Sequence, residues 1–128
     1  MLRLPTLRAI AAAMIVSGPT LLPAPASAHA QLLTEVPAAG AAVATPAPTE
    51  LRLSFSEAIE LSFTKVAITG PDGAAIATGT LSLDPADAKT LIVPLMAPLP
   101  AGTITVTWTA VAADGHKSKG SYTLTVAG

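Results

Sequence analysis

The sequence predicts an all-β domain, an antiparallel β-sandwich with Greek-key connections between its strands. Several short segments alternate apolar and polar residues with the two-residue period of a half-buried strand. Frequent Gly- and Pro-containing turn signals separate these segments, and no stretch forms a convincing amphipathic helix. About seven short strands with this pattern are typical of a β-sandwich.

The predicted strands follow one another from residue 32 onward. A short first strand is expected at residues 32–36. Residues 37–48 are rich in Ala, Pro and Gly, and their prolines cannot donate hydrogen bonds to a sheet, so they indicate an irregular connection or, alternatively, a disordered linker. Later strands are expected at residues 50–55, 64–69, 74–78, 80–83, 90–95, 103–111 and 121–126.

Three local features refine this pattern. Residues 70–73 (Gly-Pro-Asp-Gly) are a strong turn signal. Pro94 lies within an expected strand and indicates a sheet edge or a bulge. Trp108 shares one face of its strand with other apolar residues, so it is predicted to lie in the core.

The N-terminus has the features of a secretory signal peptide, residues 1–28. Two arginines form a positive n-region, residues 9–16 form most of an apolar h-region, and residues 26–28 (Ala-Ser-Ala) match the small-x-small pattern of signal peptidase. A membrane anchor is the alternative. However, Gly and Pro interrupt the apolar run, which falls short of the roughly 20 residues that span a bilayer. We therefore expect export and a mature domain of residues 29–128.

The composition of the mature domain excludes several classes of function. Loss of Arg3 and Arg8 leaves five of the seven basic residues against eight acidic ones, a net charge near −3. Nucleic-acid binding needs clustered Lys and Arg instead, so no nucleic-acid partner is expected. The chain has no cysteine, which excludes disulfides and thiolate metal sites. No second apolar run of membrane length follows, so the mature protein is expected to be soluble.

The two histidines of the chain could belong to one metal site. After cleavage, His29 would offer an α-amine and an imidazole nitrogen to the same ion. Asp114 and His116 could add an oxygen and a nitrogen if their loop turns through Gly115. Three nitrogens and one carboxylate oxygen suit Cu(II). Zn(II) prefers a tetrahedral arrangement, and the single methionine of the mature domain, Met96, cannot build a sulfur-rich Cu(I) site.

No catalytic residues can be assigned from the motifs. Neither histidine lies in a G-x-S-x-G context, and no Gly-rich loop precedes a helix, so no nucleotide cofactor is expected. From the residues alone, a solvated loop histidine at position 116 and a frayed terminus at position 29 remain the simpler alternatives to a metal site.

An ordered set of motifs runs through the mature chain. It comprises His29-Ala30, residues 36–40 (VPAAG), 51–57 (LRLSFSE), 98–103 (PLPAGT), 106–108 (VTW) and 113–116 (ADGH), with Gly120 closing the pattern. Together these motifs resemble the CopC family of periplasmic copper-binding proteins. The resemblance covers essentially the whole mature chain, and the ordered set is far more specific than any one motif.

The resemblance implies a seven-stranded Greek-key β-sandwich, Ig-like or cupredoxin-like, that binds one Cu(II). The ligands that it implies are His29, through amine and imidazole, together with Asp114 and His116. Glu57 matches a family glutamate close to the copper, although a solvated charge is its alternative. The implied role is not enzymatic: a periplasmic protein of copper homeostasis or resistance that sequesters copper or passes it to an inner-membrane CopD-type transporter. We expect a monomer.

Two departures from the family pattern concern the metal. Copper(I)-binding relatives carry a Met-rich loop, whereas the corresponding residues 70–83 contain no Met or His, so the chain resembles the Cu(II)-only branch. Lys117 stands where the family often has proline. Together with Lys119 it adds positive charge beside the expected site but removes no ligand.

Two other functions compete with copper carriage. A copper oxidase or monooxygenase would use the same N-terminal histidine in a histidine brace, but Asp114 would fill a position that dioxygen needs. The four aromatic residues, Phe55, Phe63, Trp108 and Tyr122, are all expected on strands and leave little for a glycan-stacking surface. A purely structural sandwich module, which would bind no Cu(II) tightly, is the third possibility.

Overall fold

A computed structural model describes Gly18, residues 29–44 and residues 47–128, so the predicted signal peptide lies outside the described residues apart from Gly18. Within this part of the chain there are nine strands and one short 3-10 helix, η1. In chain order they are β1 (Leu32–Val36), β2 (Ala42–Val43), β3 (Glu50–Phe55), η1 (Leu61–Phe63), β4 (Lys65–Thr69), β5 (Ala75–Ile76), β6 (Ser82–Asp84), β7 (Asp87–Pro94), β8 (Gly102–Val111) and β9 (Lys117–Val126).

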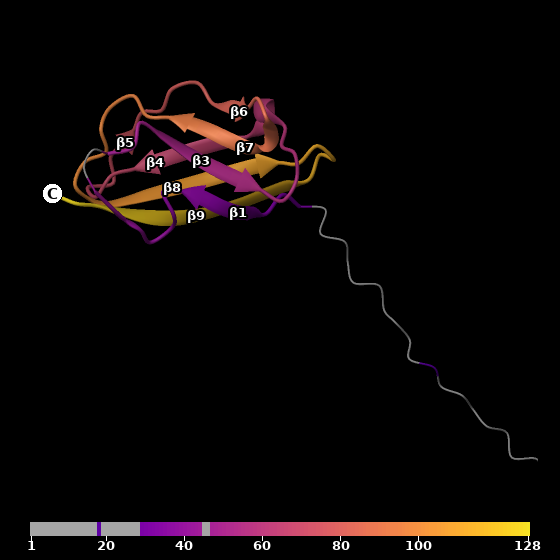
Figure 1. The fold of residues 1–128 in the computed structure, drawn as a ribbon, viewed down its shortest axis with the longest axis horizontal. Helices are drawn as coiled ribbons and strands as arrows, with labels where there is room; N and C mark the ends of the chain where they lie inside the picture. The colour runs from indigo at the N-terminus through magenta and orange to yellow at the C-terminus, as the bar shows by residue number, and fades with distance from the viewer. Residues whose placement is uncertain (1–17, 19–28, 45–46) are drawn as a thin grey trace, which may run out of the picture.

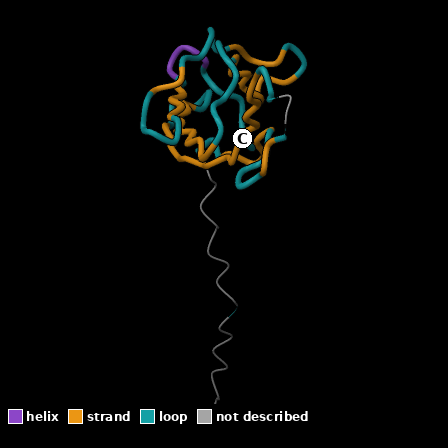
Figure 2. The backbone as a smooth tube through the Cα atoms, turned by 90° about the vertical axis from the view of Figure 1, so that its left-hand side faces the viewer, coloured by secondary structure: helices purple, strands orange, loops and turns teal. Residues whose placement is uncertain are grey.

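The strands form two sheets that pack into a sandwich (Figure 1). One sheet has the order β1-β3-β7-β6, and the other has the order β2-β9-β8-β4-β5. Neighbours such as β3 and β7 are not consecutive in the chain, so the connections cross between sheets as in Greek-key sandwiches. Figure 2 views the sandwich from the end where the C-terminus lies. The predicted all-β sandwich is confirmed.

The strands outnumber the predicted seven partly because a segment expected to be irregular also pairs. Ala42 and Val43 of β2 lie beside Thr125 and Val126 of β9, and this is the one parallel pairing among the described strands. The sandwich is therefore not purely antiparallel. Proline removes only its own N–H group, so the two residues of β2 remain free to join the sheet edge.

Several strand boundaries differ from the sequence prediction, and the start of β9 and the place of β7 in its sheet differ most clearly. β9 begins at Lys117 rather than at residue 121, because its polar first residues continue the antiparallel register with β8. β7 is an interior strand between β3 and β6, so the sheet edge inferred from Pro94 is wrong. The alternative inferred from Pro94, a bulge, agrees with the pairing around it, because the register shifts by one residue between Thr78↔Leu95 and Ser82↔Ile92. Pro94 is the last residue of β7, and its carbonyl still accepts a hydrogen bond from the Gly79 N–H at 2.9 Å.

The core lies between the inner faces of the two sheets. Its largest fully buried side chains are Phe55, Leu51, Leu53, Ile68, Leu91, Ile104, Leu124, Val93 and Val106. Trp108 is 7% exposed and packs edge-to-face against Phe55, which confirms its predicted core position. Gly120 faces Trp108 across the β8–β9 pair, where a Cβ atom would lie 2.7 Å from the indole ring. A side chain at position 120 would therefore displace the tryptophan.

One aromatic residue is not where the sequence pattern placed it. Phe63 ends η1 instead of lying on a strand, and 65% of its surface is exposed. The described residues contain no helix that is long and apolar enough to cross a membrane.

Candidate metal centre

The loop between β8 and β9 is a tight turn at one end of the sandwich. The Ala112 N–H donates to the His116 carbonyl at 2.9 Å, and the Gly115 N–H donates to the Ala112 carbonyl at 2.8 Å. Gly115 has a φ of +90°, a conformation that L side chains rarely adopt. The turn predicted at Gly115 therefore forms, and it places Asp114 and His116 at the tip of the hairpin.

Asp114 contacts His116 through both carboxylate oxygens. Oδ1 accepts the His116 backbone N–H at 3.0 Å, and Oδ2 lies 3.0 Å from the ring nitrogen Nδ1. The backbone hydrogen bond is the main cause that lowers the pKa of Asp114, and the side-chain contact with His116 and the charge of His29 lower it further against an opposing effect of burial. The Asp114 carboxylate is thus held in the ionised form that a cation needs.

A clamp of hydrogen bonds brings the segment before β1 to this loop. Ala30 is fully buried, and its carbonyl accepts a hydrogen bond from the Ser118 hydroxyl on β9. The Gln31 N–H donates to Ser56 Oγ at 2.9 Å, and the Ser56 N–H donates to the Gln31 carbonyl at 2.8 Å. The backbone next to His29 is therefore fixed between the end of β3 and the start of β9.

The clamp places the imidazoles of His29 and His116 side by side. Their centroids are 5.2 Å apart, and the ring planes make an angle of 85°. The centroid of an imidazole that binds a metal at about 2 Å lies about 3 Å from the ion, so two rings on one ion can be up to about 6 Å apart. The observed separation fits within this limit, and both rings face solvent.

The remaining donors are less closely gathered. Among the described residues, no three His, Asp or Glu side chains converge as a preformed metal cluster. Both oxygens of Asp114 are already engaged with His116. Glu57 is half-buried just after Ser56, and within the described part of the chain it forms no hydrogen bond or ion pair, so its role close to the metal remains a prediction.

Two residues that position the centre were missed from the sequence. Ser56 and Ser118 hold residues 29–31 in place, yet a serine at a strand end carries no pattern that distinguishes such a clamp from solvated surface. The one signal available in the sequence was the two-residue spacing that places Ser118 on the same face of β9 as Tyr122, Leu124 and Val126.

Comparisons with known proteins agree with this architecture. Residues 32–127 match the model of the CopC domain family. The protein YobA of Escherichia coli strain K12 is 42% identical over 121 residues, which cover 94% of this chain and 97% of YobA. Copper resistance protein C of Pseudomonas syringae pv. tomato is 35% identical over 109 residues, which cover 83% of this chain and 86% of the relative.

Solved structures lead to the same family. The crystal structure of PcoC, a methionine-rich copper resistance protein from Escherichia coli, superposes with a TM-score of 0.68 at 36% identity and covers 77% of this chain and 99% of PcoC. CopC from Methylosinus trichosporium OB3b has a TM-score of 0.70 at 24% identity over 77% of this chain and 94% of its own, which supports the fold. From the family match and these relatives, the chain belongs to the CopC family.

Proposed function

We propose that residues 29–128 are an exported copper-resistance protein that carries one Cu(II) at the His29–His116 end of the sandwich. The observation that carries this proposal is the placement of the two imidazoles 5.2 Å apart beside the Asp114 carboxylate. Relatives named copper resistance protein C support the copper-resistance role. The signal peptide, residues 1–28, would direct export, and its removal would release the mature protein into the periplasm.

Cu(II) suits these donors better than other ions. His29 supplies an amine and an imidazole once cleavage frees its nitrogen, and His116 supplies a second imidazole. Nitrogen-rich sites bind Cu(II) most strongly among the divalent first-row metals. Thioether sulfur, which Cu(I) prefers, comes in the mature domain only from Met96. Met96 follows β7 at the end of the sheet where β3 begins, whereas the histidines lie where β3 ends.

Asp114 can serve the ion in two ways. As the fourth ligand, its carboxylate turns from His116 towards the metal. Alternatively, it keeps its hydrogen bond to Nδ1, so that His116 binds through Nε2 and Asp114 fixes the ring orientation, as carboxylates behind metal-bound histidines commonly do. We favour the ligand role, because three nitrogens and one oxygen complete the square arrangement of Cu(II). Glu57 would lie next to these ligands without binding the ion itself.

An exposed metal site at the tip of a hairpin suits a protein that carries copper better than one that catalyses a reaction. His116 and Asp114 face solvent, so an acceptor can approach the ion directly. A monomeric carrier of this kind would hold copper in the periplasm and release it to an inner-membrane transporter of the CopD type.

The decisive experiment is a Cu(II) titration of residues 29–128 followed by electron paramagnetic resonance. One equivalent should bind with a type-2 spectrum that shows nitrogen coupling. The matched control carries one additional glycine before His29, which turns the amine into an amide while every strand is kept. This control should lose most of the affinity, and equal affinity in both proteins would remove His29 chelation from the proposal.

A further inference from the structure

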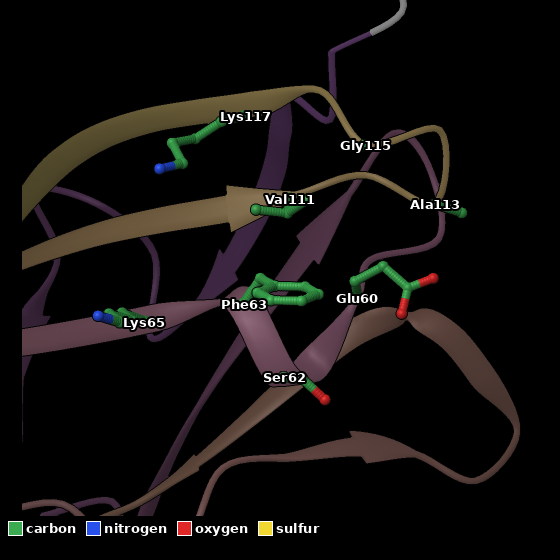
Figure 3. Close-up of a pocket in the computed structure, with 8 residues that line it drawn as sticks. All are labelled: Glu60, Ser62, Phe63, Lys65, Val111, Ala113, Gly115 and Lys117. Atoms are coloured by element: carbon green, nitrogen blue, oxygen red, sulfur yellow. The ribbon is translucent and has the colours of Figure 1, made fainter.

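A cleft of about 540 Å³ opens beside the candidate metal centre. Its walls come from η1, from the starts of β4 and β9, and from the end of β8 with its loop (Figure 3). The lining residues that matter here are Glu60, Ser62, Phe63, Lys65, Val111 and Lys117. Ala113 and Gly115 also line the cleft, and they alternate along the loop with Asp114 and His116. The cleft and the metal centre therefore share one loop.

The floor of the cleft is an exposed aromatic side chain on a well-fixed support. Phe63 is 65% exposed, and Figure 3 shows its ring beneath Val111 and between Glu60 and Lys65. The Glu60 N–H donates to the Val111 carbonyl at 2.8 Å, and the Thr64 hydroxyl donates to the Glu60 carbonyl at 2.8 Å. These bonds fix η1 to the end of β8, so the Phe63 ring is exposed on a rigid support.

Positive charge gathers on the sheet side of this cleft. Lys65, Thr109 and Lys119 lie in one row across β4, β8 and β9, and Lys117 lies two residues before Lys119 on the same face. Within the described residues none of these three lysines forms an ion pair, whereas Arg52 is bonded to Glu50 and Asp84. Three of the five basic residues of the acidic mature domain, all on this face of the sheet, thus form no ion pair with the described residues, and two of them, Lys65 and Lys117, line the cleft with Phe63.

We propose that this cleft docks an acidic peptide segment of the protein that exchanges copper with this chain, with an apolar side chain of the segment seated on Phe63. This inference rests on the proposed copper-carrying function. An apolar anchor surrounded by complementary charge is the usual composition of a protein-binding hot spot. A partner held here would lie against the loop that carries His116, and would thereby reach the ion.

The shape and charge of the cleft favour a protein over an anionic membrane surface. A hollow of this volume admits a side chain, while a flat layer of lipid headgroups would not enter it. Glu60 also lies on the wall away from the lysines and would repel phosphate groups (Figure 3). A peptide segment with a defined order of charged and apolar residues can instead place its acidic side chains next to the lysines and away from Glu60.

The test uses a short peptide, acetyl-Asp-Glu-Leu-Asp-Glu-amide, added to isotope-labelled residues 29–128, which contain all nine strands. Amide shifts should change at Phe63, Lys65, Val111 and Lys117, and the affinity should fall as salt is raised. Phe63→Ala and the double variant Lys65→Glu/Lys117→Glu should each weaken binding about tenfold or more. Val36→Ala and Lys89→Glu change an exposed apolar residue and an exposed lysine elsewhere, and should bind like the wild type.

Three results would overturn the docking surface: no shift on this face, equal loss in the control variants, or binding to phosphatidylglycerol vesicles through these residues without binding to the peptide. Cu(II) titration of the same variants separates this inference from the proposed function. Phe63→Ala should retain wild-type Cu(II) affinity. Peptide binding by a wild-type chain that takes up no Cu(II) would keep the docking surface and remove the copper-carrying function.

Discussion

Asp114 holds His116 by two bonds at once, one to the backbone N–H and one to the ring nitrogen Nδ1, each at 3.0 Å. This pairing fixes the direction of the imidazole before any ion arrives. It also makes Asp114 the residue whose replacement separates a direct ligand role from an orienting one. The substitution Asp114→Asn keeps a side-chain oxygen but removes the charge.

Asp114→Asn is therefore expected to weaken Cu(II) binding by about 10- to 100-fold, the range seen when partners of metal ligands are changed. If Asp114 is a ligand, the paramagnetic resonance parameters should shift as an oxygen donor is replaced. If it only orients His116, the parameters should remain and the affinity alone should fall. An unchanged affinity would exclude both roles.

His116→Ala should abolish most Cu(II) binding and leave folding nearly intact. Loss of a ligand should reduce Cu(II) affinity by more than the roughly 100-fold seen when a residue bonded to a ligand is changed. Replacement of an exposed loop side chain, in contrast, changes the free energy of unfolding by only about 0.5 kcal/mol. Copper titration and urea unfolding of the metal-free protein measure the two effects. A loss of stability comparable to the loss of binding would indicate a structural histidine.

Ser118→Ala tests the clamp that brings His29 to the hairpin. Its hydroxyl bonds the buried Ala30 carbonyl, and one such hydrogen bond contributes about 1 kcal/mol, equivalent to about fivefold in affinity if the loss falls on the copper-competent conformation. Ser121→Ala, on the exposed face of the same strand, is the matched control and should change neither affinity nor stability. Equal effects of the two variants would contradict the clamp.

Acid should weaken copper binding and destabilise the metal-free protein over different pH ranges. Protons compete with Cu(II) for the two imidazoles and the amine, so affinity should fall as pH falls. Because the folded pKa of Asp114 lies below its unfolded value, its contribution to stability is present above the unfolded value and disappears as pH falls through the folded one. Urea unfolding of wild type and Asp114→Asn should therefore differ at neutral pH, and the difference should disappear as pH falls below the ordinary aspartate pKa and through the lowered folded one.

An oxidase can be separated from a carrier by ascorbate-driven peroxide production. The copper-loaded protein should produce no more peroxide than an equal concentration of free copper, because a filled coordination plane leaves no position for dioxygen. Turnover well above free copper, lost in His116→Ala, would instead favour the histidine-brace enzyme. Phe63 is exposed, but one aromatic side chain does not form the flat surface that a polysaccharide needs.

The alternation of apolar residues was enough to predict the sandwich and most of its strands. Trp108 shows why: its strand buries every second residue along most of its length, a pattern that only a two-faced sheet satisfies. β2 could not be predicted, because two residues next to β9 pair through backbone groups alone and leave no period in the sequence. The sheet edge inferred from Pro94 was wrong for a related reason, since a proline at a strand end removes no interior hydrogen bond.

The candidate site was predicted less completely than the fold. Asp114 and His116 were found together because they share one turn, whereas the approach of His29 depends on Ser56 and Ser118, which lie far from it in sequence. The exposure of Phe63 was missed because a three-residue helix has no periodicity of its own. Local motifs thus located the candidate donors, and long-range hydrogen bonds decide whether they meet.

Because Ala30 is buried, the folded protein is sensitive to the exact position at which signal peptidase would cleave the chain. Cleavage one residue late would start the protein at Ala30 and force a charged amine into a position with no exposed surface, which is costly. Cleavage one residue early would leave His29 in place but move the amine away from its imidazole. Ragged processing would therefore appear as two populations, one poorly folded at its edge and one folded but unable to chelate, so metal stoichiometry of the exported protein would report the fidelity of signal peptidase.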